Sequence, residues 1–169
     1  SGVFFNACNQ HGIKFKKLEK EEANRKNFEK SLRLLDYNFV ILNGHGALDI
    51  ITGHKGEILI KSGENHNLLC DRITYARSCW AALELGEACM KNNNEGCFLG
   101  YNIPFMFLID VTHATNPIKD HVAEIFFETS NLIPFGLIKG QTAKIAEENS
   151  KKSMLKAIKK ALIKGDNDS

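Results

Sequence analysis

The sequence predicts an α/β fold, a sandwich around a mostly parallel sheet, from three observations. Short apolar runs alternate with longer amphipathic segments, as in chains built from strand–helix–strand units. Residues 39–42 are apolar at every position, which is typical of a strand covered on both faces. Clusters of Asn and Gly, such as residues 43–46, end the predicted strands. A length of 169 residues suits one domain, so we expect a single domain over residues 1–169.

The elements follow from apolar periodicity and turn residues. Strands are expected at residues 3–8, 39–42, 72–78, 97–100 and 105–109, with a hairpin formed by residues 49–53 and 57–61. Helices are expected at residues 15–35, 80–91 and 142–164, and another begins at Asn116, a capping residue followed by Pro117. Gly165 is expected to stop the last helix. Six lysines of that helix lie opposite its apolar positions without interleaved aromatics, which favours a solvated face over a nucleic-acid surface.

The composition excludes several classes of protein. With 43% hydrophobic and 25% charged residues, the chain resembles neither a disordered tail nor a coiled coil. A formal net charge of +2 is too small to indicate a nucleic-acid or membrane partner. The longest apolar run, residues 103–109, is far shorter than the roughly 20 residues that span a bilayer. No basic segment followed by an apolar stretch opens the chain, so we expect no signal peptide and a cytoplasmic location.

The cysteines and histidines do not have the spacing of a metal site. Five cysteines form an odd set without a C-x-x-C pair, which disfavours a disulfide framework and a zinc site. His45, His54 and His66 lack the H-x-x-x-H spacing. We therefore expect no metal and no cofactor.

Chemically capable residues follow two of the predicted strands. His45 comes just after residues 39–42, and Cys79 comes directly after residues 72–78. If these strands are neighbours in the sheet, the imidazole and the thiol emerge at the same edge, where α/β folds gather their active groups. A thiol is mostly protonated at neutral pH, and a nearby imidazole activates it. The pattern predicts His45 as general acid/base and Cys79 as nucleophile.

The residues around this pair suggest two further contributions. A helix directly after Cys79 would favour its thiolate through the helix dipole. Gly46 has no Cβ and lets its backbone approach a substrate closely. The N–H groups of Gly46 and Cys79 would then stabilise an oxyanion, each contributing about 3 kcal/mol. The plainer alternatives are that His45 is an ordinary turn residue and Cys79 a buried thiol.

Two segments resemble the signatures of the caspase-like cysteine peptidases of clan CD. Residues 39–46 read FVILNGHG, an apolar strand followed by His-Gly, and residues 73–82 read ITYARSCWAA, a strand ending in Cys before a helix. The pattern is most similar to bacterial CHAT-type domains and covers residues 39–110. The resemblance implies a caspase-like three-layer sandwich and a Cys–His dyad without a third member, which cleaves a specific protein through an acyl-enzyme. The short spacing between His45 and Cys79 departs from the family pattern.

Substrate preference depends on two further residues. Arg77 shares a strand face with Cys79, and in related peptidases this position lines the substrate pocket. There Arg77 would favour an acidic side chain. Asp110, at the end of a predicted strand, would either pair with Arg77 or face the pocket itself and favour a basic side chain. The sequence leaves both arrangements open.

Two other classes of function compete with a peptidase. A catalytically inactive interaction or regulatory domain on the same fold would bind a partner at this edge. A nucleotide-binding domain would use residues 43–46 as a phosphate loop, but neither G-x-G-x-x-G nor a Walker lysine is present. The expected partners are a protein or peptide substrate and a regulatory protein or larger complex, with no nucleic acid and no membrane.

Overall fold

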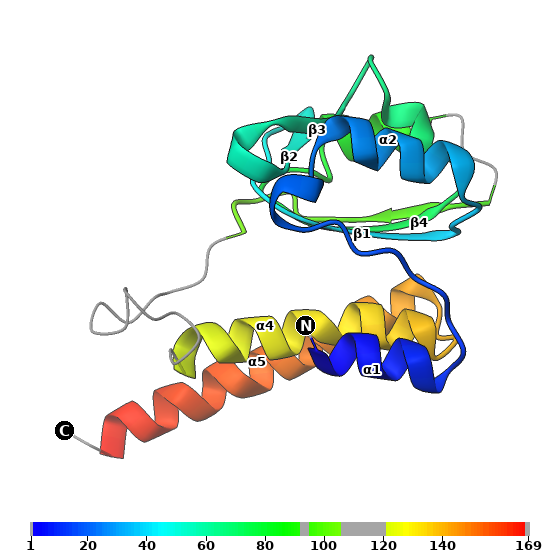
Figure 1. The fold of residues 1–169 in the computed structure, drawn as a ribbon. Helices are drawn as coiled ribbons and strands as arrows, with labels where there is room; N and C mark the ends of the chain where they lie inside the picture. The colour runs from blue at the N-terminus through cyan, green and yellow to red at the C-terminus, as the bar shows by residue number, and fades with distance from the viewer. Residues whose placement is uncertain (1, 92–94, 106–120, 168–169) are drawn as a thin grey trace. The chain divides into compact units, whose positions relative to one another are not determined.

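A computed structural model describes residues 2–91, 95–105 and 121–167. The chain divides into two compact units (Figure 1), which we call the sheet unit, Lys14–Met106, and the helical unit, Ser1–Ile13 with Phe107–Ser169. The sheet unit contains all the strands found among the described residues. The expectation of one domain over residues 1–169 stays a prediction.

A parallel sheet of three strands organises the sheet unit. The strands are β1 (Phe39–Asn43), β4 (Ile73–Arg77) and β5 (Cys97–Leu99), in the order β1-β4-β5. Both neighbouring pairs are parallel. The predicted strands at 39–42, 72–78 and 97–100 are therefore confirmed, as is the mixed α/β class with a mostly parallel sheet. The predicted strand at 105–109 lies outside the described residues except for Phe105.

The predicted hairpin is also present. Strands β2 (Ile50–Thr52) and β3 (Ile58–Lys61) pair in antiparallel fashion and form a separate two-stranded sheet. The turn between them contains Lys55 at φ 53°, in the left-handed region. An isolated bridge between Gly46 and Ile51 joins the hairpin to the chain that leaves β1.

Two helices of the sheet unit begin later than the sequence predicts. The helix expected from residue 15 is α2 (Arg25–Leu34), and it begins where the Asn24 side chain accepts a hydrogen bond from the N–H of Asn27. The preceding charged residues form only the short 3-10 helix η1 (Lys20–Glu22). The helix expected from residue 80 is α3 (Glu84–Met90). A second 3-10 helix, η3 (His66–Leu69), precedes β4.

One hydrophobic core holds the sheet unit together. Helix α2 lies across the sheet with the hairpin beside it (Figure 1). The core draws on every layer, with residues Phe28, Leu32, Val40, Leu42, Ile51, Leu59, Ile60, Leu68, Leu69, Ala76, Ala81, Leu85 and Cys89. In β1 only the alternate residues Val40 and Leu42 are buried, while Phe39 and Ile41 are half-buried and Asn43 is exposed. The strand is therefore fully buried on one face only, whereas its continuous apolar residues predicted burial on both faces.

The helical unit consists of α1 (Gly2–Gln10), α4 (His121–Ile138) and α5 (Ala143–Asn167). In Figure 1, α4 and α5 lie alongside each other, and the Ser150 hydroxyl donates to the carbonyl of Thr129 at 2.8 Å. The predicted strand at residues 3–8 is wrong, because this run is helical and the Phe4 ring packs against Phe135 of α4, with ring centroids 5.4 Å apart. A short apolar run suits either element, so only its packing partner decides between them.

The last helix is confirmed, although it continues past its expected end. Gly165 lies inside α5 instead of stopping it. The helix start expected at Asn116 lies outside the described residues. None of the described helices has both the length and the apolarity needed to cross a membrane.

Candidate functional site

The strands that carry the predicted site are neighbours. β1 and β4 are parallel, and Asn43 lies opposite Arg77 in their register. His45 and Cys79 each follow two residues after this last pair. Parallel strands end at the same edge of a sheet, so the histidine and the cysteine leave the sheet at one edge, as the sequence analysis required.

The backbone at Gly46 packs directly against Cys79. An ideal Cβ placed on Gly46 would lie 2.6 Å from the Cys79 carbonyl oxygen, 3.1 Å from the Cys79 nitrogen and 2.8 Å from the Ser78 Cβ. The buried Ser78 hydroxyl donates to the carbonyl of Gly44 at 3.0 Å. Gly46 is therefore required for the contact between the two strand ends, whatever else binds there. Ser78, which the sequence analysis did not single out, ties the same ends together.

The hairpin holds the turn that contains His45. The N–H of Thr52 donates to the His45 carbonyl at 2.9 Å. At Gly44, a Cβ would lie only 2.2 Å from the Thr52 carbonyl oxygen, so a larger residue does not fit there. The His45 side chain itself is exposed. Its backbone is thus fixed while its imidazole remains accessible from solvent.

The Cys79 sulfur is half-buried and contacts the backbone of Phe105. The Phe105 N–H donates to Sγ at 3.2 Å, and the Phe105 carbonyl oxygen lies 3.9 Å from the same sulfur. Among the residues that the structure describes, no hydrogen bond joins the His45 ring to this sulfur. Catalytic hydrogen bonds are often loose before substrate binds and tighten in the substrate complex.

The expected helix does not begin directly after Cys79. Helix α3 begins at Glu84, five residues later, and its first residues point their N–H groups elsewhere in the fold. Cys79 is instead followed by Trp80 at φ 52°, a left-handed conformation that is unfavourable for a residue with a Cβ. The N–H of Trp80 donates to the Ile103 carbonyl at 3.2 Å, which holds this turn. The prediction that a helix directly follows Cys79 is therefore wrong, and the effect of a helix N-terminus on its thiolate stays a prediction.

Two backbone N–H groups remain available at the strand ends. Within the described ranges, neither the Gly46 N–H nor the Cys79 N–H donates a hydrogen bond to another protein group. Their residues are in close backbone contact. The oxyanion role of these two amides stays a prediction, and the available donors are consistent with it.

Arg77 belongs to a cluster with two tyrosines. Its guanidinium carbon lies 5.6 Å from the centroid of the Tyr75 ring, and the Tyr75 hydroxyl lies 3.2 Å from the Tyr101 hydroxyl. Burial and the neighbouring Tyr75 raise the pKa of Tyr101 well above its ordinary value, although Arg77 opposes the shift. The Tyr101 hydroxyl therefore stays protonated and is a hydrogen-bond partner of the Tyr75 hydroxyl. Strand alternation places Tyr75 on the same face as Arg77, two residues later, whereas no local signal pointed to Tyr101.

Asp110, the second predicted specificity residue, lies outside the described residues. Whether it pairs with Arg77 or faces the pocket stays open, and so does the choice between acidic and basic substrates.

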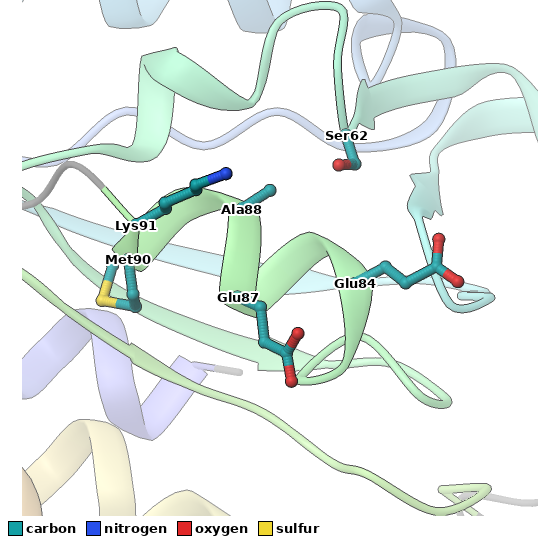
Figure 2. A pocket seen from close by; sticks show the side chains of 6 residues that line it. All are labelled: Ser62, Glu84, Glu87, Ala88, Met90 and Lys91. Atoms are coloured by element: carbon teal, nitrogen blue, oxygen red, sulfur yellow. The ribbon is translucent and has the colours of Figure 1, made fainter.

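An open pocket lies elsewhere on the sheet unit (Figure 2). It has a volume of about 720 Å³ and is lined by Ser62, Glu84, Glu87, Ala88, Met90 and Lys91. All of these residues except Ser62 belong to α3 or directly follow it, and none was predicted as a site residue. No group of three metal-ligating side chains occurs within residues 2–91, 95–105 and 121–167.

All five cysteines are free thiols. Burial raises the pKa of the thiols of Cys8, Cys70 and Cys97, and it raises the pKa of Cys89 to about 12. These four thiols are therefore poorly suited to act as nucleophiles at neutral pH.

No family model, curated protein or solved structure matches this chain. The similarity to caspase-like peptidases rests on the two sequence motifs alone.

Proposed function

We propose that the chain is a caspase-like cysteine endopeptidase with a His45–Cys79 dyad, on a fold whose helices enclose the central sheet in a three-layer sandwich. The observation that carries the proposal is the pairing of β1 with β4. Their parallel register ends at Asn43 and Arg77, and the backbone of Gly46 then packs on Cys79. A histidine and a cysteine held at adjacent strand ends are the minimum that thiolate chemistry needs.

The proposed reaction proceeds in two stages. The imidazole of His45 takes the thiol proton, and the Cys79 sulfur attacks the carbonyl carbon of the scissile peptide bond. His45 then gives the proton to the leaving amine, and a thioester acyl-enzyme remains. A water molecule, deprotonated by His45, hydrolyses the thioester and restores the free thiol. His45 is exposed, so its ring is able to turn toward the sulfur when substrate binds.

The negatively charged tetrahedral oxygen needs hydrogen-bond donors. The N–H groups of Gly46 and Cys79 supply them in this proposal, since neither is used by the protein within its described part. Loss of one such donor typically lowers kcat by about 10²–10³.

For the substrate we propose a protein or peptide with an acidic side chain before the scissile bond. Arg77 ends β4 two residues before Cys79, and its guanidinium carbon lies 5.6 Å from the centroid of the Tyr75 ring. A guanidinium suits a carboxylate, which accepts several hydrogen bonds in a bidentate geometry.

The experiment is peptide cleavage by matched variants. Cys79→Ala and His45→Ala are tested against a peptide library that contains acidic and basic residues. Cys97→Ala and His11→Ala are the controls, because they remove a half-buried cysteine from β5 and an exposed histidine after α1. We expect cleavage to disappear in the first pair and to persist in the controls. A wild-type protein that cleaves nothing, or undiminished cleavage by Cys79→Ala, would overturn the proposal.

The alternative is an inactive interaction domain on the same fold. It is favoured by the contacts of the Cys79 sulfur, which go to Phe105 and not to the His45 ring. Alkylation distinguishes the two functions. If iodoacetamide modifies Cys79 no faster than an ordinary exposed cysteine at neutral pH, the inactive domain is the better description.

A further inference from the structure

We infer that the backbone N–H of Phe105 is a positioning group for the proposed nucleophile, holding the Cys79 sulfur in place and favouring its thiolate. This inference rests on the proposed function. The observation is the 3.2 Å hydrogen bond from this N–H to the sulfur.

The position of Phe105 is set by the chain around it. The N–H of Ala82 donates to the Tyr101 carbonyl at 3.1 Å, and the N–H of Trp80 donates to the Ile103 carbonyl at 3.2 Å. These two bonds align residues 101–103 antiparallel to residues 80–82. Two residues beyond Ile103, the chain reaches Phe105, which therefore lies beside the residues just before Trp80. There its N–H contacts the sulfur of Cys79.

An aromatic contact supports the same segment. The rings of Tyr101 and Phe105 lie with their centroids 4.6 Å apart. The Tyr101 hydroxyl is also within 3.2 Å of the Tyr75 hydroxyl on β4. The segment that carries the Phe105 N–H is therefore anchored to the sheet on which Cys79 is placed.

The chemistry of the contact favours the charged sulfur. An N–H donor is attracted more strongly to a thiolate than to a thiol, because charge-assisted hydrogen bonds are the stronger ones. The Phe105 carbonyl oxygen accepts a hydrogen bond only from the protonated Cys79 thiol, and this contact is longer, at 3.9 Å. Since α3 begins at Glu84, the Phe105 N–H occupies the role that the sequence analysis had assigned to a helix N-terminus.

Other titratable or charged groups belong to the elements around Cys79. They are His45 after β1, Arg77 at the end of β4, Tyr101 on the segment of Phe105, and Glu84 at the start of α3. The test must therefore change the Phe105 N–H alone and leave these groups intact.

Phe105→Pro removes this N–H, and Phe105→Ala is the matched control that loses the ring but keeps the N–H. The rate of alkylation of Cys79 by iodoacetamide is measured in the full chain from pH 5 to pH 10, with peptide mass spectrometry to identify the modified cysteine. For Phe105→Pro we expect the pH midpoint of alkylation to rise by about one unit and the rate at neutral pH to fall about tenfold. Phe105→Ala loses the ring contact with Tyr101 but keeps the N–H, so its midpoint should rise less than that of Phe105→Pro. A wild-type midpoint in a folded Phe105→Pro variant would overturn the inference.

A second measurement covers the case in which the proline variant does not fold. In wild-type protein, the NMR shift of the Phe105 amide proton should change with pH at the midpoint of Cys79 alkylation, and this change should vanish in Cys79→Ala. An amide proton that does not follow that midpoint would also overturn the inference. Neither measurement uses a peptide substrate, so failure here is distinct from failure of the peptidase proposal, which the cleavage assay tests.

Discussion

Replacement of Gly46 by alanine tests the contact that brings the two strand ends together. The new methyl carbon would lie 2.6 Å from the Cys79 carbonyl oxygen and 2.8 Å from the Ser78 Cβ. Carbon atoms pack best at about 3.5–4.0 Å, so the strand ends must separate by roughly 1 Å. Most of the close atoms are backbone atoms, which do not rotate away. The overpacking should lower the free energy of unfolding by about 1–3 kcal/mol.

The same displacement should affect the proposed chemistry more strongly than the stability. A misplacement of about 1 Å between reacting groups costs on the order of 10²-fold in rate. Urea denaturation followed by far-UV circular dichroism measures the first effect, and peptide cleavage measures the second. Both are measured on the same preparation, so that loss of activity is corrected for the unfolded fraction.

Ser78→Ala is the matched control for this substitution. It removes the hydrogen bond from Ser78 to the Gly44 carbonyl without adding an atom to the contact. We expect it to cost about 1 kcal/mol and to retain most of the cleavage activity. A Gly46→Ala protein with wild-type stability and wild-type cleavage would refute the reasoning, because the two backbones would then not be in the contact described.

Three further predictions concern the scaffold. The guanidinium of Arg72 donates to three backbone carbonyls, two of them belonging to α2 and η3, so Arg72→Ala should lower the free energy of unfolding by about 2–4 kcal/mol in urea denaturation, and Arg72→Lys should recover only part of it. Hydrogen bonds from Arg25 and Asn65 lower the pKa of Glu29 in the folded protein from its ordinary value of 4.5. As the pH falls, the unfolded chain therefore binds the proton first. The stability that the ionised Glu29 contributes is present above about pH 4.5 and is lost as the pH drops through the pKa of Glu29 in the folded protein. The urea midpoint of Arg25→Gln should consequently fall less between pH 7 and pH 3 than that of the wild type, and an equal fall would contradict this account. Cys89, fully buried with its pKa raised to about 12, should resist iodoacetamide at pH 8 in native protein and react only after unfolding; rapid native labelling would contradict the packing described.

Local sequence signals were enough to predict a mostly parallel sheet and the two reactive residues that follow its strands. Residues 39–42 are an apolar run ended by Asn and Gly, and residues 72–78 are rich in strand-forming residues; such local signals depend only on neighbouring positions. The hairpin was predictable for the same reason. The sequence left the pairing of the two strands as a condition, and the structure shows that β1 and β4 are neighbours. The approach of His45 to the Cys79 edge was therefore predicted only on that condition.

Where the local signals were ambiguous, tertiary contacts set the type of an element or the residue at which it begins. Residues 3–8 suit a strand or a helix, and packing of Phe4 on Phe135 accompanies the helix. Residues 80–83 have good helix formers, yet the left-handed Trp80 and its hydrogen bond to Ile103 delay the start of α3. The partner of the Cys79 sulfur is 26 residues away in the chain. No periodicity encodes such a contact, because it arises only when the completed sheet and the segment after β5 pack together.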